Sequence, residues 1–237
     1  MRMIRKTMMK VKVLTIFPEI FPGFLGYSLT GKALSEGLWS LDCVNIRDYA
    51  FDKHGSVDDT PCGGGAGMVM RPDVLGAAIS ANYHGGRIIY MSPRGEPLTQ
   101  DKVKELSREE SLTIVCGRFE GVDQRVLDAW NIEEISIGDY ILTGGEQAAQ
   151  IMLDAVVRLI PGVLGNSEST SDESFEDGLL EHPQYTRPIE WEGRTVPEVL
   201  LSGHHKKIAE WQHQEALEIT KRRRPDLLKK YLDSKRV

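Results

Sequence analysis

The side chains with the most obvious catalytic potential are carboxylates in one short stretch, GVLGNSESTSDESFEDGLL, at residues 162–180. This stretch holds five acids, five serines or threonines and no basic residue; the acids are Glu168, Asp172, Glu173, Glu176 and Asp177. A carboxylate can act as a general base, but this composition is more typical of a solvated tether. Composition alone therefore favours a linker, and a catalytic role needs support from elsewhere in the chain.

Arg158 and a group of histidines are further candidates for chemistry. Arg158 follows Asp154 by four residues in a predicted helix over 146–160, so its spacing favours an ion pair on the helix surface. An arginine could also stabilise a developing oxyanion. His204, His205 and His213 do not predict a metal site, because adjacent helical positions point to different faces and residues 205 and 213 lie about 12 Å apart along a helix.

The elements that must position these residues alternate between strands and helices. Apolar runs predict strands at 12–17, 87–91 and 112–116, and helical patterns are expected at 30–36, from about 99, from about 122 and at 146–160. Pro161 and Gly162 stop the last of these helices. The first 160 residues therefore predict an α/β fold with an open, doubly wound sheet.

Three loops follow predicted strands, at 91–97, 117–121 and 138–145. Open α/β sheets bind ligands at the carboxyl ends of their strands, so these loops are the expected ligand site. The chain has neither G-x-G-x-x-G nor G-x-x-x-x-G-K-[ST], which argues against a dinucleotide fingerprint and a P-loop. A further glycine-rich stretch, Asp58 to Met68, is interpreted as a mobile loop.

The C-terminal part differs from the rest in charge. The chain has a net charge of −6, yet residues 203–237 carry ten Lys/Arg against five Asp/Glu, whereas the other 202 residues have a net charge of −11. Helices are predicted from 205 to 223 and from Pro225 onward, forming a small helical domain. Trp211 and the basic residues Lys206, Lys207, Lys221, Arg222, Arg223 and Arg224 have the composition of a phosphate-contacting surface, which favours a polyanionic partner.

Composition restricts the class of protein. The 237 residues are 41% hydrophobic, enough for a buried core, and no apolar run approaches the roughly 18 residues of a membrane helix. Cys43, Cys62 and Cys116 are far apart, so neither a zinc site nor a disulfide framework is indicated, and a reducing cytoplasm is the expected location. Residues 1–8 are interpreted as a short extension, with Met9 as an alternative start.

Eight ordered strings together resemble one family, the bacterial tRNA (guanine-N(1))-methyltransferases of the SPOUT class, which modify the guanosine immediately 3′ of the anticodon. The resemblance covers about Met9 to the C-terminus. The strings are IFPEIF, VDDTPCGGGAGM, YMSPRG, VCGRFEGVDQRV, SIGDYILTGGE, RLIPGVLG, GLLEHPQYTRP and VPEVLLSGHH. The resemblance implies a homodimer with each site at the subunit boundary, and the tRNA anticodon stem-loop as partner.

The resemblance also implies a fold that general rules would not predict. Connections in proteins are almost always unknotted, whereas the family threads the C-terminal portion of its parallel sheet into a deep trefoil knot. The implied domains are 9–164 for methyl transfer, 165–181 as a flexible acidic linker, and 182–237 for tRNA binding.

S-adenosylmethionine is the implied methyl donor, held by the three loops. Phe119 stands where the family usually has tyrosine. The implied donor-binding residues are Tyr90, Met91, Ser92, Pro93, Gly117, Arg118, Phe119, Glu120, Gly121, Ser136, Ile137, Gly138, Tyr140, Leu142, Gly144 and Gly145. No metal ligand is implied, and magnesium assistance is neither indicated nor excluded.

For catalysis the family uses an arginine in its R-[FL]-I-P-G-V-L-G string and an aspartate in a DSF string. Arg158 matches the arginine. The second string here is SDESF, so Glu173 occupies the expected aspartate position and Asp172 precedes it. Glu173 is the expected base because Phe175 and Gly178 fix the register, and Asp172 is the alternative if the loop shifts by one residue.

The acidic linker then has a reason to exist, because it could order over a flipped base when tRNA binds. Residues 166–178 are accordingly predicted to be poorly ordered without tRNA. Two rival functions remain: a non-catalytic RNA-binding relative that lost the aspartate, and a SPOUT enzyme that methylates the ribose 2′-oxygen.

Overall fold

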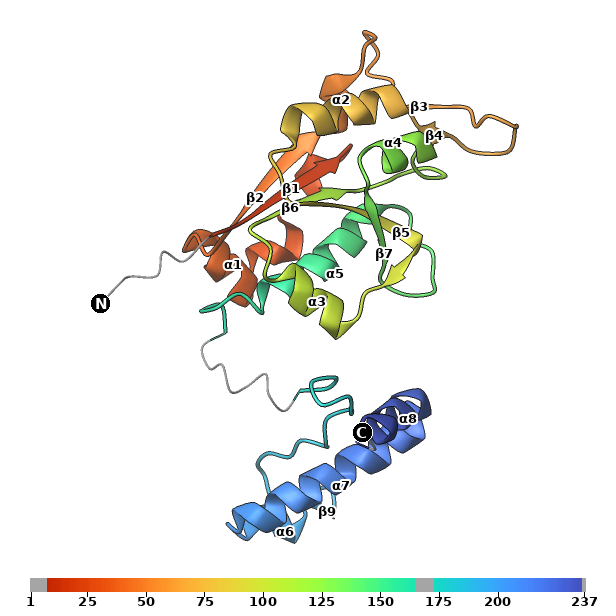
Figure 1. Ribbon diagram of the computed structural model, residues 1–237. Helices are drawn as coiled ribbons and strands as arrows, with labels where there is room; N and C mark the ends of the chain where they lie inside the picture. The colour runs from red at the N-terminus through yellow and green to blue at the C-terminus, as the bar shows by residue number, and fades with distance from the viewer. Residues whose placement is uncertain (1–7, 165–172, 236–237) are drawn as a thin grey trace. The chain divides into compact units, whose positions relative to one another are not determined.

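A computed structural model describes residues 8–164 and 173–235 and divides the chain into two compact units, residues 1–165 and 166–237 (Figure 1). The first unit contains a five-stranded, all-parallel sheet with the order β2-β1-β6-β5-β7. Its strands are β1 (Met9–Thr15), β2 (Trp39–Asn45), β5 (Arg87–Pro97), β6 (Ser111–Val115) and β7 (Glu133–Ser136). The α/β class and the parallel sheet predicted from the sequence are confirmed.

Helices cover both faces of this sheet (Figure 1). One face packs against α1 (Ser28–Ser35), α3 (Gln100–Leu106) and α5 (Gly145–Val157), and the other against α2 (Pro72–Asn82) and α4 (Gln124–Ala129). Short 3₁₀ turns at Pro18–Ile20, Gly23–Gly26 and Ile46–Tyr49 and the two-residue strands β3 (Asp58–Asp59) and β4 (Val69–Met70) complete the unit.

The central strand β1 shows why the sequence folds into two cores. Side chains alternate across a strand, and Val11 and Val13 pack with α1, α3 and α5, whereas Leu14 packs with α2 and α4. All three are at most 2% exposed. A strand covered on both faces needs apolar residues at successive positions, which is the pattern of KVKVLTIF.

Several predicted boundaries are corrected. The first strand spans Met9–Thr15 rather than 12–17, and the helix predicted to reach residue 160 ends at Val157. Residues 91–97 are not a simple loop, because β5 pairs with β7 up to Met91 and again from Glu96. Residues 92–95 form a bulge within β5 between these points, where Pro93 has no N–H to donate.

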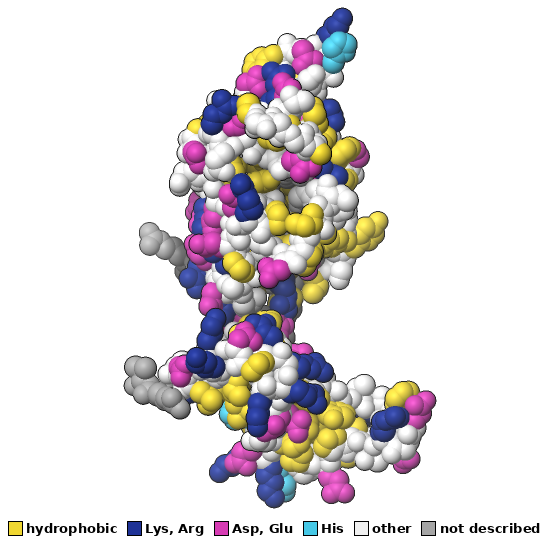
Figure 2. Space-filling model, turned by 90° about the vertical axis from the view of Figure 1, so that its right-hand side faces the viewer, with side chains coloured by type: hydrophobic (Ala, Val, Ile, Leu, Met, Phe, Trp, Pro, Cys, Tyr) yellow, Lys and Arg dark blue, Asp and Glu magenta, His cyan; other side chains and the backbone are white. Residues whose placement is uncertain are grey.

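The second unit is mainly helical. It contains α6 (Glu198–Leu201), α7 (His205–Arg223) and α8 (Pro225–Ser234), and also a short antiparallel hairpin of β8 (Glu190–Trp191) and β9 (Arg194–Thr195) that the sequence did not predict. Figure 2 shows basic and acidic side chains together on this unit. Trp211, expected on a phosphate-contacting surface, is half-buried, with its ring centroid 6.1 Å from that of Tyr185 and 6.4 Å from that of His182.

None of the helices within 8–164 and 173–235 is both long and apolar enough to cross a membrane. The same residues contain no group of three or more His, Cys, Asp or Glu side chains that could hold a metal ion.

Replacing Gly76 by alanine should stabilise the first unit. Gly76 lies within α2, and a Cβ built there meets no atom of the described residues within 4 Å. Alanine is favoured over glycine in a helix interior by up to about 1 kcal/mol. Urea unfolding should show a higher midpoint for Gly76→Ala, and an equal or lower midpoint would contradict the open environment of this position.

Candidate active site

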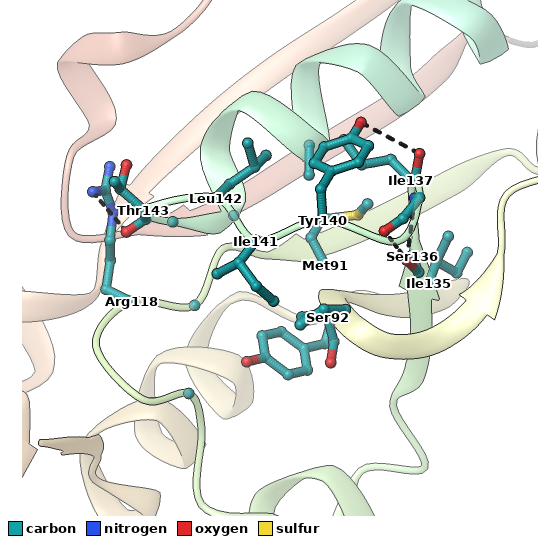
Figure 3. A pocket seen from close by; sticks show the side chains of 18 of the residues that line it. Met91, Ser92, Arg118, Ile135, Ser136, Ile137, Tyr140, Ile141, Leu142 and Thr143 are labelled. Atoms are coloured by element: carbon teal, nitrogen blue, oxygen red, sulfur yellow. Dashed lines mark hydrogen bonds between the residues drawn. The ribbon is translucent and has the colours of Figure 1, made fainter. Parts of the chain in front are cut away.

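A cavity of about 250 Å³ lies at the carboxyl ends of β5, β6 and β7 (Figure 3). All sixteen residues that the resemblance implied for donor binding line it, from Tyr90 at one end of the sequence range to Gly145 at the other. Four further lining residues were missed: Ile135, Ile141, Thr143 and Ala148. Ile141 and Thr143 belong to the predicted loop 138–145, so the loop position could have identified them.

Much of the cavity wall is backbone, because several glycines have no room for a side chain. A Cβ on Gly117 would lie 2.6 Å from the ring of Tyr90, and one on Gly138 would lie 2.6 Å from the ring of Tyr140. The Tyr140 hydroxyl donates to the Ile137 carbonyl at 3.4 Å, at the end of the cavity formed by residues 136–140 (Figure 3). At these points the wall is therefore formed by backbone without a side chain.

The second and third loops are joined to each other at the opposite end. The Gly145 N–H donates to the Gly117 carbonyl at 2.9 Å. Nη1 of Arg118 donates to the Thr143 carbonyl at 3.3 Å, and both residues are seen at the left of Figure 3. Two segments that are 25 residues apart thus form one wall.

Arg118 is held from behind by a fully buried carboxylate. Glu146, in the first turn of α5, is 0% exposed, and its Oε2 lies 2.9 Å from Nη2 of Arg118. Its Oε1 accepts a hydrogen bond of 2.7 Å from the hydroxyl of Thr15, the last residue of β1. The Arg118 guanidinium also lies 4.6 Å from the ring centroid of Phe17.

Two titrating groups beside the cavity, the Tyr90 phenol and the Cys116 thiol, have raised pKa values. Burial, together with the nearby Glu134 carboxylate, raises the pKa of the Tyr90 phenol above its usual 10.0. Burial and then Glu146 raise the pKa of the Cys116 thiol well above 9.0. Loss of either proton would place a negative charge in a low-dielectric environment, which is unfavourable.

Comparison with known proteins decides the family. The family model described as tRNA (Guanine-1)-methyltransferase TrmD matches residues 9–230. The chain belongs to the tRNA (guanine-1)-methyltransferase family. As the sequence predicted, this makes it a methyltransferase of tRNA modification.

Relatives named tRNA (guanine-N(1)-)-methyltransferase are similar over nearly the whole chain. The relative from Rhodospirillum rubrum is 61% identical over 225 residues, which is 94% of each chain. The Ruegeria pomeroyi relative is 57% identical over 230 residues, 95% of each chain. The Bartonella quintana relative is 60% identical over 222 residues, covering 94% of this chain and 96% of its own.

In this methyltransferase the glycine-rich stretch 58–68 is anchored at its C-terminal end. The Glu120 N–H donates to the Met68 carbonyl, and the Met70 N–H donates to the Gly121 carbonyl, both at 2.9 Å. Gly67 has a φ of +88°, and a Cβ there would lie 2.4 Å from the Glu120 side chain. Residues 67 and 68 at the end of this stretch therefore pack against the second loop of the site, and the mobility expected of the stretch stays a prediction.

The candidate catalytic residues belong to different units. Arg158 is half-buried at the C-cap of α5, one residue beyond the helix, and its N–H donates to the Asp154 carbonyl at 3.2 Å. Glu173 is the first described residue of the second unit and is also half-buried. It lines a cavity of about 290 Å³ together with Asp177, Leu179, Leu180, Glu181, His182, Ala209, Gln212, His213 and Ala216. Asp172 and Glu168 lie outside the described residues.

The described part of the acidic stretch forms a turn that packs against α7. The Phe175 N–H donates to the Leu179 carbonyl at 2.8 Å, and the Leu180 N–H donates to the hydroxyl of Thr220 on α7 at 2.9 Å. Leu179 is 6% exposed. Within the second unit, residues 173–181 are thus packed against α7. Residues 165–172 fall outside the described residues. The expected ordering of the linker by tRNA stays a prediction.

Proposed function

We propose that the protein transfers the methyl group of S-adenosylmethionine to ring nitrogen 1 of the guanosine immediately 3′ of the anticodon. Family membership supports the reaction class, and the observation that carries the donor site is the convergence of sixteen implied residues on one cavity. The cavity lies at the carboxyl edge of a parallel sheet, where α/β proteins place their ligands.

The lining fits this donor better than it fits a nucleotide phosphate. The glycines at 117, 138, 144 and 145 keep this wall free of side chains, and Ile135, Ile137 and Leu142 offer apolar contact to an adenine. Among the described lining residues, Arg118 and Glu120 are the only members of the Lys, Arg, Asp and Glu group, and the arginine is paired with Glu146. This wall suits an uncharged adenosine attached to a sulfonium.

A trefoil knot at this site is part of the proposal. The chain leaves β7 at the edge of the sheet, passes the backbone of Gly117, and enters α5, where Glu146 meets Thr15 of the interior strand β1. A path from the edge strand across the second loop to the middle of the sheet is what a threaded C-terminal segment requires.

The methyl transfer needs two catalytic groups from the protein. A base must accept the proton of guanine nitrogen 1, and a cation must stabilise the negative charge that builds on the adjacent 6-oxo oxygen. Glu173 takes the proton, with Asp172 as the alternative, and Arg158 stabilises the oxygen. The sulfonium of the donor supplies an electrophilic methyl group, and the neutral thioether is the leaving group, so charge and atoms balance.

The general base and the stabilising arginine come together in a homodimer, in which the linker and second unit of one chain meet the donor site of the other. Exposed apolar side chains near the cavity support such a covered face: Ile141 is 80% exposed, Tyr140 51% and Phe119 48%. The basic residues of α7 and α8 bind the phosphates of the anticodon stem. The domains are 9–164, 165–181 and 182–237, and the reaction takes place in the cytoplasm.

The deciding experiment is mass-spectrometric mapping of nucleosides in tRNA treated with the pure protein and S-adenosylmethionine. We expect 1-methylguanosine at the position 3′ of the anticodon, and no methylation when that position is adenosine, which has no proton on nitrogen 1. A ribose 2′-O-methyltransferase would modify both transcripts, and a non-catalytic relative would modify neither. Either of these results would overturn the proposal.

Replacing Gly144 by alanine should weaken binding of S-adenosylmethionine by about tenfold, the typical effect of forcing a methyl group into a filled site. The added Cβ would lie 2.3 Å from Nε of Arg118, displacing that side chain from Thr143 and Glu146. Backbone strain is not the cause, because φ of Gly144 is 178°. Isothermal titration calorimetry measures the effect.

The matched control is Gly76→Ala, which adds the same methyl group in α2 where a Cβ meets no atom of the described residues within 4 Å. Its donor affinity should equal that of the unmodified protein. An affinity within twofold of normal for Gly144→Ala would show that Arg118 does not need its observed position.

A further inference from the structure

Glu146 is a buried residue at the end of the string SIGDYILTGGE, but it is neither one of the implied donor-binding residues nor part of the cavity lining. It is 0% exposed, whereas Arg118, its ion-pair partner, lines the cavity. The pair therefore has one member in the wall and the other directly behind it. Removing one partner of a buried pair leaves an uncompensated charge, which is strongly unfavourable.

The contact between these two residues is electrostatic in nature. Although Oε2 of Glu146 is 2.9 Å from Nη2 of Arg118, this oxygen and Nε of Arg118 form no hydrogen bond with any described residue. The directional contacts go elsewhere: Nη1 of Arg118 donates to Thr143, and Glu146 accepts from Thr15. What Glu146 supplies to Arg118 is thus mainly negative charge.

This charge matters because the proposed donor and its product differ in charge at one atom. S-adenosylmethionine carries a positive sulfonium, and S-adenosylhomocysteine has a neutral sulfur in the same place. An unpaired guanidinium in the wall would repel the first and leave the second unaffected. A guanidinium does not lose its proton in proteins, so only a fixed negative charge can cancel it.

We propose that Glu146 is a positioning residue that neutralises Arg118 and thereby lets the cavity accept a cationic sulfonium ligand in preference to its neutral thioether product. The inference rests on the proposed function, because it takes the cavity as the donor site. The ion pair with Glu146 would then have a structural role as well, because it holds Arg118 where its bond to Thr143 joins the loops 117–121 and 138–145.

The test compares the affinities of S-adenosylmethionine and S-adenosylhomocysteine by calorimetry in the unmodified protein and in Glu146→Gln. Glutamine keeps the shape and can still accept from Thr15, but it removes the charge. We expect affinity for S-adenosylmethionine to fall about tenfold more than affinity for S-adenosylhomocysteine, equivalent to about 1.4 kcal/mol. An equal loss for both ligands contradicts the inference.

The matched control is Thr15→Val, which removes the other partner of Glu146 and changes no charge. It should alter both affinities by the same factor, as any purely structural disturbance would. The double variant Arg118→Met with Glu146→Gln removes both charges and should restore the normal ratio of the two affinities.

Arg118→Met alone keeps the inference testable if Glu146→Gln does not fold. It leaves the buried Glu146 charge without its partner, so it should shift the ratio in the opposite direction, toward S-adenosylmethionine. No shift, or a shift toward S-adenosylhomocysteine, overturns the inference. If the unmodified protein binds neither ligand, the proposed function fails and this inference with it, whereas an unchanged ratio in the variants removes the inference alone.

Discussion

Glu173→Gln should lower the rate of single-turnover methylation by about 10²- to 10⁴-fold, the usual contribution of a general base. The amide cannot accept the guanine proton, but it has the size of the carboxylate, so binding of tRNA and donor should change little. Rapid-quench measurement with saturating enzyme isolates the chemical step from product release. A rate within threefold of normal would show that Glu173 is not the base.

Asp172→Asn is the matched control, because it removes one negative charge from the adjacent position of the same acidic stretch. We expect it to retain nearly the normal rate. If only the Asp172 change abolishes turnover, the register is displaced by one residue and Asp172 is the base. Glu173→Asp provides a third measurement: retreat of the carboxylate by about 1 Å should cost up to about 10²-fold while leaving detectable activity.

Arg158→Met is expected to lower the single-turnover rate by about 10²- to 10³-fold, the typical cost of removing one group that stabilises an oxyanion. Methionine preserves the apolar stem of the half-buried side chain, so the C-cap of α5 should stay intact. The affinity for S-adenosylmethionine should stay within twofold, since Arg158 does not line the cavity. Single-turnover kinetics and calorimetry on the same sample separate the two effects.

Arg108→Met is the control for the loss of an arginine in the same unit. Arg108 is exposed and lies just before β6 begins at Ser111, at the amino edge of the sheet and thus opposite the cavity. It should leave the rate unchanged. A similar loss in both variants would point to a general effect of charge on tRNA binding, and would remove Arg158 from the mechanism.

Local patterns in the sequence determined the parts of this protein that depend on near neighbours. The helix from His205 to Arg223 has the predicted limits, and Thr99 caps α3 by accepting the Lys102 N–H. The three loops could be located because an apolar run, a glycine-bearing turn and a helical periodicity follow one another in the sequence, each over about ten residues or fewer. The identity of the donor residues within those loops came from resemblance, since glycines and small polar residues do not by themselves indicate a ligand.

Only the tertiary structure decided which distant residues share a site. Read locally, Glu146 is an acid in the first turn of a helix, which is favourable at any such position. Its contact with Thr15 joins residues 131 apart, and the same fold places Arg118 between the cavity and this carboxylate. Likewise, the bulge of β5 at residues 92–95 depends on its pairing with β7. Sequence patterns report the preferences of a segment over one or two turns, whereas these contacts depend on where chain segments far apart in sequence are brought side by side.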